Sequence, residues 1–227
     1  MTVLTVCLMA LFVRLGFWQW HKGQLKSMQV AQYNQGGQTA LDLGSRHTDE
    51  LPRFAVIDVE GRYDVEHQFL LDNISHHGRP GYEVLTPLQL ADGRSLIVNR
   101  GWVPLLGDRS QLPDVRLESG AVRQVAGRLD NLPVVGISLG HIPPALDSHW
   151  PKLTSFPTMS DLSTALGQPL ESRQLLLGSD QPSGFVREWQ LGGFDPSRYL
   201  SYAVQWWAFA ALALILYGYL NWHRSGS

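Results

Sequence analysis

The run from Tyr202 to Trp222 constrains this chain more than any other feature, because it contains no Asp, Glu, Lys or Arg. A helix rises about 1.5 Å per residue, so a run of this length matches the roughly 30 Å of a bilayer's hydrocarbon core. Trp and Tyr side chains stand near both of its ends, as they do at the two headgroup levels of membrane helices. Upstream, Asp195 and Pro196 supply an N-cap and a first-turn residue. We predict a transmembrane helix over residues 195–222, rather than a buried core helix, with a cytoplasmic tail over residues 223–227.

A second apolar segment covers residues 1–20 and ends in Phe17, Trp18 and Trp20. It has neither a basic start nor a small-residue cleavage site, which favours an uncleaved transmembrane anchor over a signal peptide. Arg14 within it either extends to the interface along its aliphatic stem, or is a fixed charge that faces the second helix or a bound anion.

The second helix carries small or branched residues at helical spacing. This stripe either lets the two helices approach closely or faces lipid. It consists of Val204, Ala208, Ala211, Ile215 and Gly218.

The charges that flank the two helices give conflicting indications of orientation. Lys22 and Lys26 follow the first helix, whereas His223 and Arg224 follow the second. Because long loops translocate largely regardless of their charge, we place the intervening domain outside the cytoplasm and both termini inside. The expected location is a bacterial inner membrane, with the protein crossing it twice and the central domain in the periplasm.

All twenty acidic residues lie between Asp42 and Asp195, which indicates a water-soluble domain between the two helices. We assign this domain to residues 51–194 and a linker to residues 21–50. Short runs rich in branched and aromatic residues alternate with turn residues and predict strands. The predicted strands are Phe54–Val59, Gln68–Asp72, Tyr82–Leu88, Ser95–Val103, Val122–Leu129, Gln174–Leu177 and Phe185–Gln190.

The turn sequence at Asp92 and Gly93 predicts a hairpin of the third and fourth of these strands. One short helix is expected over Ser160–Leu166, capped by Ser160 or Thr158. The predicted fold class is therefore two transmembrane helices that flank a mainly antiparallel β-barrel or sandwich-like domain with a short helix.

Composition and motifs exclude several functions. Eighteen basic and twenty acidic residues leave a net charge of −2, which gives no positive field for nucleic acid. The single cysteine, Cys7, permits neither an internal disulfide nor a CxxC metal pair. No hydrolase or nucleotide-binding motif occurs, so the sequence carries no catalytic signal. His76 and His77 are adjacent and in a strand would face opposite sides, so we expect a solvated pair and no metal site.

Three ordered motifs remain that composition does not explain. LGFWQ spans Leu15–Gln19, GYEVLTP is followed by DGRSLIVNRGWVP up to Pro104, and YAVQWWAFA opens the second helix. Taken singly, Trp18 is equally well an interfacial anchor, and the Asn99–Gly101 segment a bulge or strand end. Together the motifs resemble the surfeit locus family of cytochrome c oxidase assembly factors, which includes the yeast Shy protein. The matching residues are Gly16, Trp18, Gln19, Gly81, Tyr82, Asn99, Arg100, Gly101, Trp102, Tyr202, Gln205 and Trp206.

This resemblance implies a chaperone, not an enzyme, that assists the insertion of haem a into the catalytic subunit of an aa3-type haem-copper oxidase. Its implied partners are that subunit, other assembly factors and membrane lipid. Members often carry His where this chain has Tyr199, so the axial ligand is either Tyr199 or His21. With them, the residues expected to contact haem as aromatic walls or propionate partners are Trp18, Trp206, Trp207, Lys22 and Arg198.

Two other functions stay open from the sequence. A scaffold that binds no haem would dock its helices on oxidase subunits and stabilise assembly intermediates, and the Tyr199 departure favours it. A membrane-anchored domain that binds lipid or quinone is compatible with the aromatic content alone.

Overall fold

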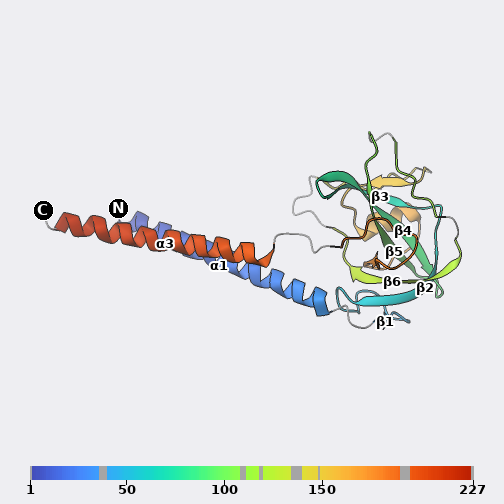
Figure 1. Ribbon diagram of the computed structural model, residues 1–227, viewed down its shortest axis with the longest axis horizontal. Coiled ribbons are helices and arrows are strands. Elements are labelled where there is room, and N and C mark those ends of the chain that lie inside the picture. Colours follow the sequence, from blue (N-terminus) through green and yellow to red (C-terminus); the bar gives the residue numbers. More distant parts are fainter. Residues whose placement is uncertain are drawn as a thin grey trace. The chain divides into compact units, whose positions relative to one another are not determined.

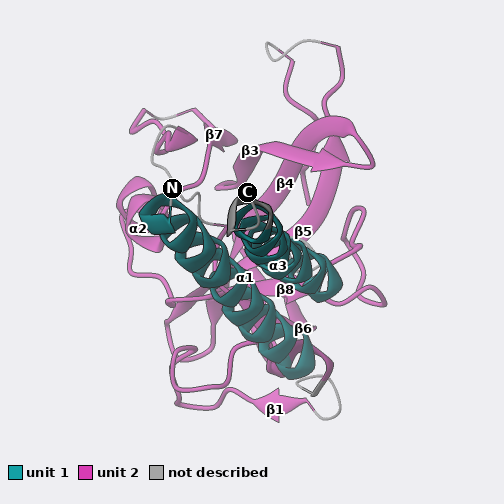
Figure 2. Cartoon of the chain, turned by 90° about the vertical axis from the view of Figure 1, so that its left-hand side faces the viewer, with its two compact units in different colours: residues 1–32, 191–227 teal, residues 33–190 magenta. Residues whose placement is uncertain are grey.

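The computed structural model describes residues 2–35, 40–107, 111–117, 120–133, 140–147, 149–189 and 195–225. The chain divides into two compact units (Figures 1 and 2). The first comprises residues 1–32 and 191–227, and the second comprises residues 33–190.

The first unit is an antiparallel pair of helices, α1 (Thr2–Gln35) and α3 (Pro196–Ser225). The start of α1 meets the end of α3, where the Tyr217 hydroxyl and the Thr2 Oγ1 are 3.0 Å apart. Both helices are long and apolar enough to cross a membrane, which confirms the two predicted terminal helices. The predicted cap of α3 is also confirmed, because the Ser197 amide donates to the Asp195 carboxylate over 2.7 Å.

Helix α1 is longer than its apolar part. The expected linker over residues 21–50 is helical as far as Gln35, because residues 24–35 contain good helix formers and neither Gly nor Pro. The β-rich unit accordingly begins at Tyr33 rather than at residue 51. Tyr33 belongs to it because its ring packs edge-on against Phe54, with 5.4 Å between the ring centroids.

The predicted small-residue stripe on α3 is not the helix contact. All five of its residues are exposed, whereas Ala203 and Ala210 are buried beside α1. The stripe is therefore not what lets the helices approach closely, and that approach depends on a neighbouring face of α3. Arg14 is exposed on α1.

The second unit is an eight-stranded, mainly antiparallel sheet in the order β1-β2-β6-β8-β5-β4-β3-β7. Because β2 pairs with both β4 and β6, the strands β2, β6, β8, β5 and β4 close into a small barrel, with β3 and β7 extending it. The strands are β1 (Leu41–Asp42), β2 (Val56–Tyr63), β3 (Phe69–His76), β4 (Arg79–Leu90), β5 (Ser95–Pro104), β6 (Val122–Asp130), β7 (Lys152–Thr154) and β8 (Gln174–Leu177).

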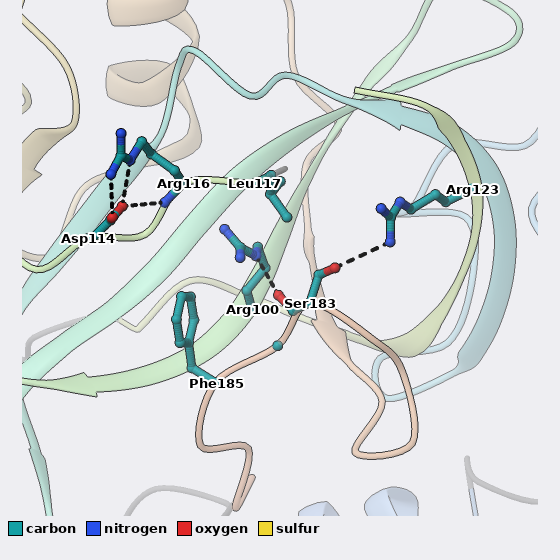
Figure 3. Close-up of a pocket in the computed structure, with 8 residues that line it drawn as sticks. Arg100, Asp114, Arg116, Leu117, Arg123, Ser183 and Phe185 are labelled. Carbon is teal, nitrogen blue, oxygen red and sulfur yellow. Dashed lines mark hydrogen bonds and ion pairs between the residues drawn. The ribbon is translucent and has the colours of Figure 1, made fainter. Parts of the chain in front are cut away.

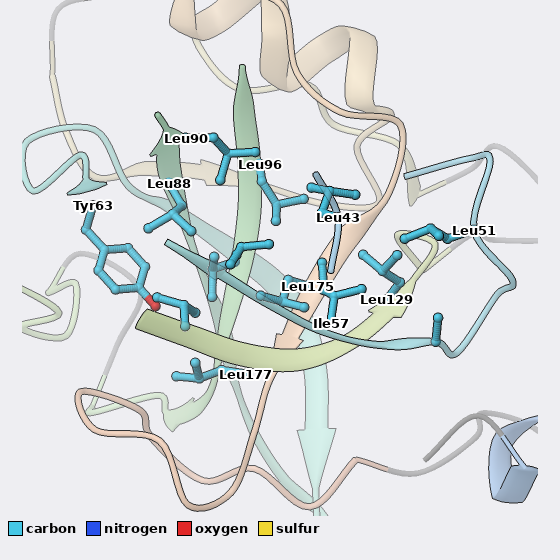
Figure 4. Close-up of a cluster of buried hydrophobic side chains, with 14 residues drawn as sticks. Leu43, Leu51, Ile57, Tyr63, Leu88, Leu90, Leu96, Leu129, Leu175 and Leu177 are labelled. Carbon is cyan, nitrogen blue, oxygen red and sulfur yellow. The ribbon is translucent and has the colours of Figure 1, made fainter. Parts of the chain in front are cut away.

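Strand β5 of the barrel wall is largely buried, since nine of its ten residues are buried. Its alternate side chains serve two cores. Leu96 and Val98 point into the barrel with the residues that Figure 4 draws, whereas Ile97 points outward to Leu162 of α2 (Met159–Leu166). Helix α2 confirms the predicted short helix, and Thr158 is its N-cap in a capping box with Asp161.

One predicted strand is wrong. Over Phe185–Gln190 the described residues form only an isolated bridge, between Val186 and Trp102, and Gln190 lies outside them. The reason is local, since the Arg187 guanidinium donates to the carbonyls of Gly178 and Gln181. These hydrogen bonds tie the segment to the preceding loop instead of to a neighbouring strand. The short strands β1 and β7 were not predicted; both pair in parallel with distant partners.

Candidate functional site

The exposed face of α1 presents three of the predicted cofactor-binding residues. Trp18, His21 and Lys22 stand at positions i, i+3 and i+4 of the helix, so they share one face. All three are exposed, and the Lys22 Nζ lies 3.9 Å from the centroid of the Trp18 ring. This face combines an aromatic surface, an imidazole and a cation.

Trp206 and Trp207 instead hold the two helices together. Trp206 stacks on Phe12, with 5.8 Å between the ring centroids, and Trp207 packs edge-on against Phe17 at 5.5 Å. A Cβ at Gly16 would overlap the indole of Trp207, so the small residue of the first motif is what lets this ring fit. Among the described residues no ring contact joins Trp18 to either of these tryptophans.

Tyr199 also lies in the helix contact. Its Cβ is 3.1 Å from the position that a Cβ on Gly23 would take. Nearby, where α3 begins, a hollow of about 290 Å³ is lined by Trp20, Gly23, Gln24, Ser27, Pro196, Ser197 and Leu200. The structure therefore places Tyr199 against α1, while Arg198 and the motif residues Tyr202 and Gln205 are exposed and Gln19 is half-buried.

In the second unit, two motif glycines are required by close approaches. Gly81 of β4 is opposite Pro104 of β5, and a Cβ there would overlap the Val103 carbonyl and lie 2.6 Å from the Trp102 ring. Gly101 has φ of 109° and faces the Val186 carbonyl, a backbone conformation and a contact that favour glycine. Beside Gly81, Tyr82 is buried in a core with Leu70 and Val84.

Asn99 is a buried hydrogen-bonding centre. Its side-chain amide donates to the Glu83 carboxylate over 2.8 Å and to the side-chain oxygen of Gln174 over 3.2 Å, while its oxygen accepts from the Gly101 backbone amide. Burial raises the pKa of the Glu83 carboxyl, and the Asn99 hydrogen bond opposes this rise.

Arg100 is only 2% exposed and is satisfied by neutral partners. Its Nε donates to the Ser183 carbonyl over 2.8 Å, and one terminal nitrogen donates to the Val115 carbonyl over 2.9 Å and to Gln68 over 3.0 Å. Burial lowers the pKa of Arg100 to about 10. The side chain borders a pocket of about 730 Å³ that also presents Arg116 and Arg123 (Figure 3).

Arg100 and Trp102 together bind the segment of residues 183–186 to the barrel. Besides the Ser183 contact, the Phe185 amide donates to the Arg100 carbonyl over 2.7 Å. Trp102 and Val186 exchange two backbone hydrogen bonds of 2.8 and 3.2 Å. The NRGWVP motif singled out Arg100 and Trp102 as candidate functional residues. Nothing in the sequence predicts that they bind residues 183–186.

The two adjacent histidines do not face opposite sides, which corrects the expectation. His76 ends β3, but His77 has φ of 48° and leaves the strand alternation. Their ring centroids are therefore 4.2 Å apart, and both rings approach Glu188.

Comparison with known proteins identifies the family to which the chain belongs. A model of the SURF1 family matches residues 6–211. Uncharacterized SURF1-like proteins of Mycobacterium bovis and of two strains of Mycobacterium tuberculosis are 30% identical to this chain over 165 residues. The matched region covers 72% of this chain and 58% of each relative, so the chain spans little more than half the length of these relatives.

Proposed function

Because this chain belongs to the SURF1 family, we propose that it is an assembly factor for an aa3-type haem-copper oxidase that assists haem a insertion into the catalytic subunit. The observation that carries the proposal is the pairing of the two terminal helices through motif residues. Gly16 accepts the Trp207 ring, and this leaves Trp18, His21 and Lys22 on the exposed side of α1. The protein acts as a chaperone and catalyses no reaction of its own.

The exposed face of α1 fits the chemistry of haem a. Haem is a flat apolar ring with anionic propionates and an iron that imidazole ligates. Trp18 offers an aromatic surface, His21 an axial nitrogen and Lys22 a cation for a propionate. His21 is the better candidate ligand, because Tyr199 is packed against Gly23.

The open character of this face suits transfer rather than storage. Trp18, His21 and Lys22 are all exposed, and none of them lines the nearby hollow where α3 begins. Haem would therefore rest on the helix surface, within reach of the oxidase subunit that receives it. The proposed location is the bacterial inner membrane, with the β-rich unit in the periplasm and both termini in the cytoplasm.

The experiment is to purify the full-length protein from haem-a-producing cells and record its Soret band. We expect His21→Ala to lose most of the band and Tyr199→Phe to retain it, whereas His149→Ala, a matched change far along the chain, leaves it unaltered. A band that persists in the His21→Ala, Tyr199→Phe double variant would remove both residues from the ligand role.

A scaffold that binds no haem is the second candidate, and one observation favours it. Trp206 and Trp207 are occupied by helix packing on Phe12 and Phe17 rather than lining a cleft with Trp18. The scaffold predicts that the wild-type protein carries no Soret band and still co-purifies with the oxidase catalytic subunit.

A further inference from the structure

We propose that His76, His77 and Glu188 form a binding site for a divalent transition-metal ion at the turn between β3 and β4. Their three ligand atoms all lie within 4.8 Å of one another. The site belongs to the β-rich unit and goes beyond the proposed handling of haem.

The turn brings both imidazoles to one side. His76 pairs with Arg79, so the hairpin loop consists of His77 and Gly78, with φ of 48° and 77°. Positive φ at both central residues is typical of a tight type I′ hairpin turn. Histidine tolerates this conformation better than most residues, and adopting it turns the His77 ring toward His76.

Glu188 reaches the turn from a distant part of the chain. The two hydrogen bonds between Trp102 and Val186 fix the segment two residues before it. The Glu188 Oε2 then lies 3.0 Å from the His77 Nε2 and 3.6 Å from the His76 Nε2. Ligands at about 2.0–2.2 Å from a tetrahedral zinc ion are about 3.3–3.6 Å apart, so both Glu188 separations are close to those of such a site. The widest separation among the three ligand atoms, at most 4.8 Å, must shorten when an ion binds.

The surroundings hold the first ligand in place. The His76 ring lies 5.1 Å from the ring of Trp102, and the Trp102 Nε1 donates to the Ile74 carbonyl over 3.2 Å. A hollow of about 220 Å³ adjoins the ligands and is also lined by Glu83. A bound ion would thus have room for a water ligand and a further carboxyl nearby.

The ligand set selects a class of ion. Two imidazoles and one carboxylate suit Zn²⁺, Co²⁺, Ni²⁺ or Cu²⁺, whereas Mg²⁺ and Ca²⁺ prefer oxygen ligands alone. Three protein ligands leave at least one position open.

Four other histidines of the described residues have fewer potential metal ligands around them than His76 and His77. Each of four others meets a single carboxylate, as a surface ion pair does, and lacks a second imidazole. These pairs are His47–Glu171, His67–Asp64, His141–Asp161 and His149–Asp147.

The test uses the full-length protein in detergent, purified through a tag that contains no histidine. Zn²⁺ binding is measured by calorimetry, and Co²⁺ binding by its visible absorption, which reports the coordination geometry. We expect one ion per chain. His77→Asn keeps a residue that tolerates positive φ, and Glu188→Gln keeps the shape of the side chain, so both variants should fold. Each should weaken binding more than about tenfold, since even outer-shell changes cost about 10- to 100-fold.

His149→Asn is the matched control, because it removes an exposed histidine that pairs with one carboxylate. It should leave the affinity unchanged. The proposal is overturned if the wild-type protein binds neither ion, if His77→Asn and Glu188→Gln bind as tightly as the wild type, or if the control loses binding to the same extent. None of these outcomes bears on the Soret experiment above.

Discussion

Gly81 faces Trp102 across the β4–β5 pair, where space for even one further carbon is missing. In Gly81→Ala the new Cβ would overlap the Val103 carbonyl oxygen, so the two strands must move apart. Overpacking of this kind costs about 1–3 kcal/mol. We expect a lower Tm for the full-length protein in detergent, followed by near-UV circular dichroism.

Gly120→Ala is the matched control for this substitution. A Cβ there would have its nearest neighbour at 3.4 Å, which is ordinary van der Waals contact. Equal Tm values for Gly81→Ala and Gly120→Ala would show that the close approach of β5 to position 81 does not require a glycine there.

Glu83 gives the fold a pH dependence with a definite sign. Burial raises the pKa of its carboxyl in the folded protein. Above the ordinary pKa of about 4.3, the unfolded chain loses a proton that the folded chain keeps. The contribution of Glu83 to stability is therefore complete below that pH and is lost as the pH rises through the folded-state pKa.

Glu83→Gln removes this titration and keeps an oxygen that accepts from the Asn99 amide. We expect the Tm of the variant, relative to wild type, to increase from about pH 4 to about pH 7. A constant difference between Glu83→Gln and wild type across this range would contradict the assignment.

The helix pair of the first unit can be tested by cross-linking. The Cβ of Tyr199 lies 3.1 Å from the ideal Cβ position of Gly23, and disulfides need about 3.8 Å between Cβ atoms. In a Cys7→Ser background, the pair Gly23→Cys and Tyr199→Cys should oxidise readily in membranes and lose its reactivity toward maleimide.

Leu25→Cys combined with Tyr199→Cys provides the control, because Leu25 is half exposed and lies two positions further round α1. This second pair should remain reduced. If both pairs oxidise at the same rate, the helices do not pack through Gly23.

Sequence patterns predicted most of the strands and helices, since alternation and turn residues are local properties. Val122–Leu129 and Gln174–Leu177 match β6 and β8 closely. The short strand β7 escaped prediction because its three residues are strand only by pairing in parallel with β3. The end of α1 was set too early, since the apolar run stops before the helix does.

The candidate site was predictable only in part, because several of its contacts join segments that are far apart in the sequence. The motifs identified Arg100 and Trp102, but their partners in residues 183–186 come from a segment far along the chain. Likewise, strand alternation predicts that His76 and His77 point to opposite sides of β3. The positive φ of His77 instead places both rings on one side, next to Glu188. Contacts of this kind depend on the tertiary fold.

The proposed topology requires the β-rich unit to be accessible from outside the cytoplasm. Glu66 is exposed near the start of β3, and Cys7 is the single native cysteine. In a Cys7→Ser background, Glu66→Cys should react with a membrane-impermeant maleimide in intact cells. Labelling that occurs only after lysis would place this unit in the cytoplasm and contradict the proposal.

A role in oxidase assembly is tested by a reduced-minus-oxidised difference spectrum of membranes from cells that lack the gene. We expect a specifically diminished haem a band, with b- and c-type signals retained, and recovery of the band when the wild-type gene is restored. A haem a band of wild-type height in the deletion strain would contradict a role in oxidase assembly.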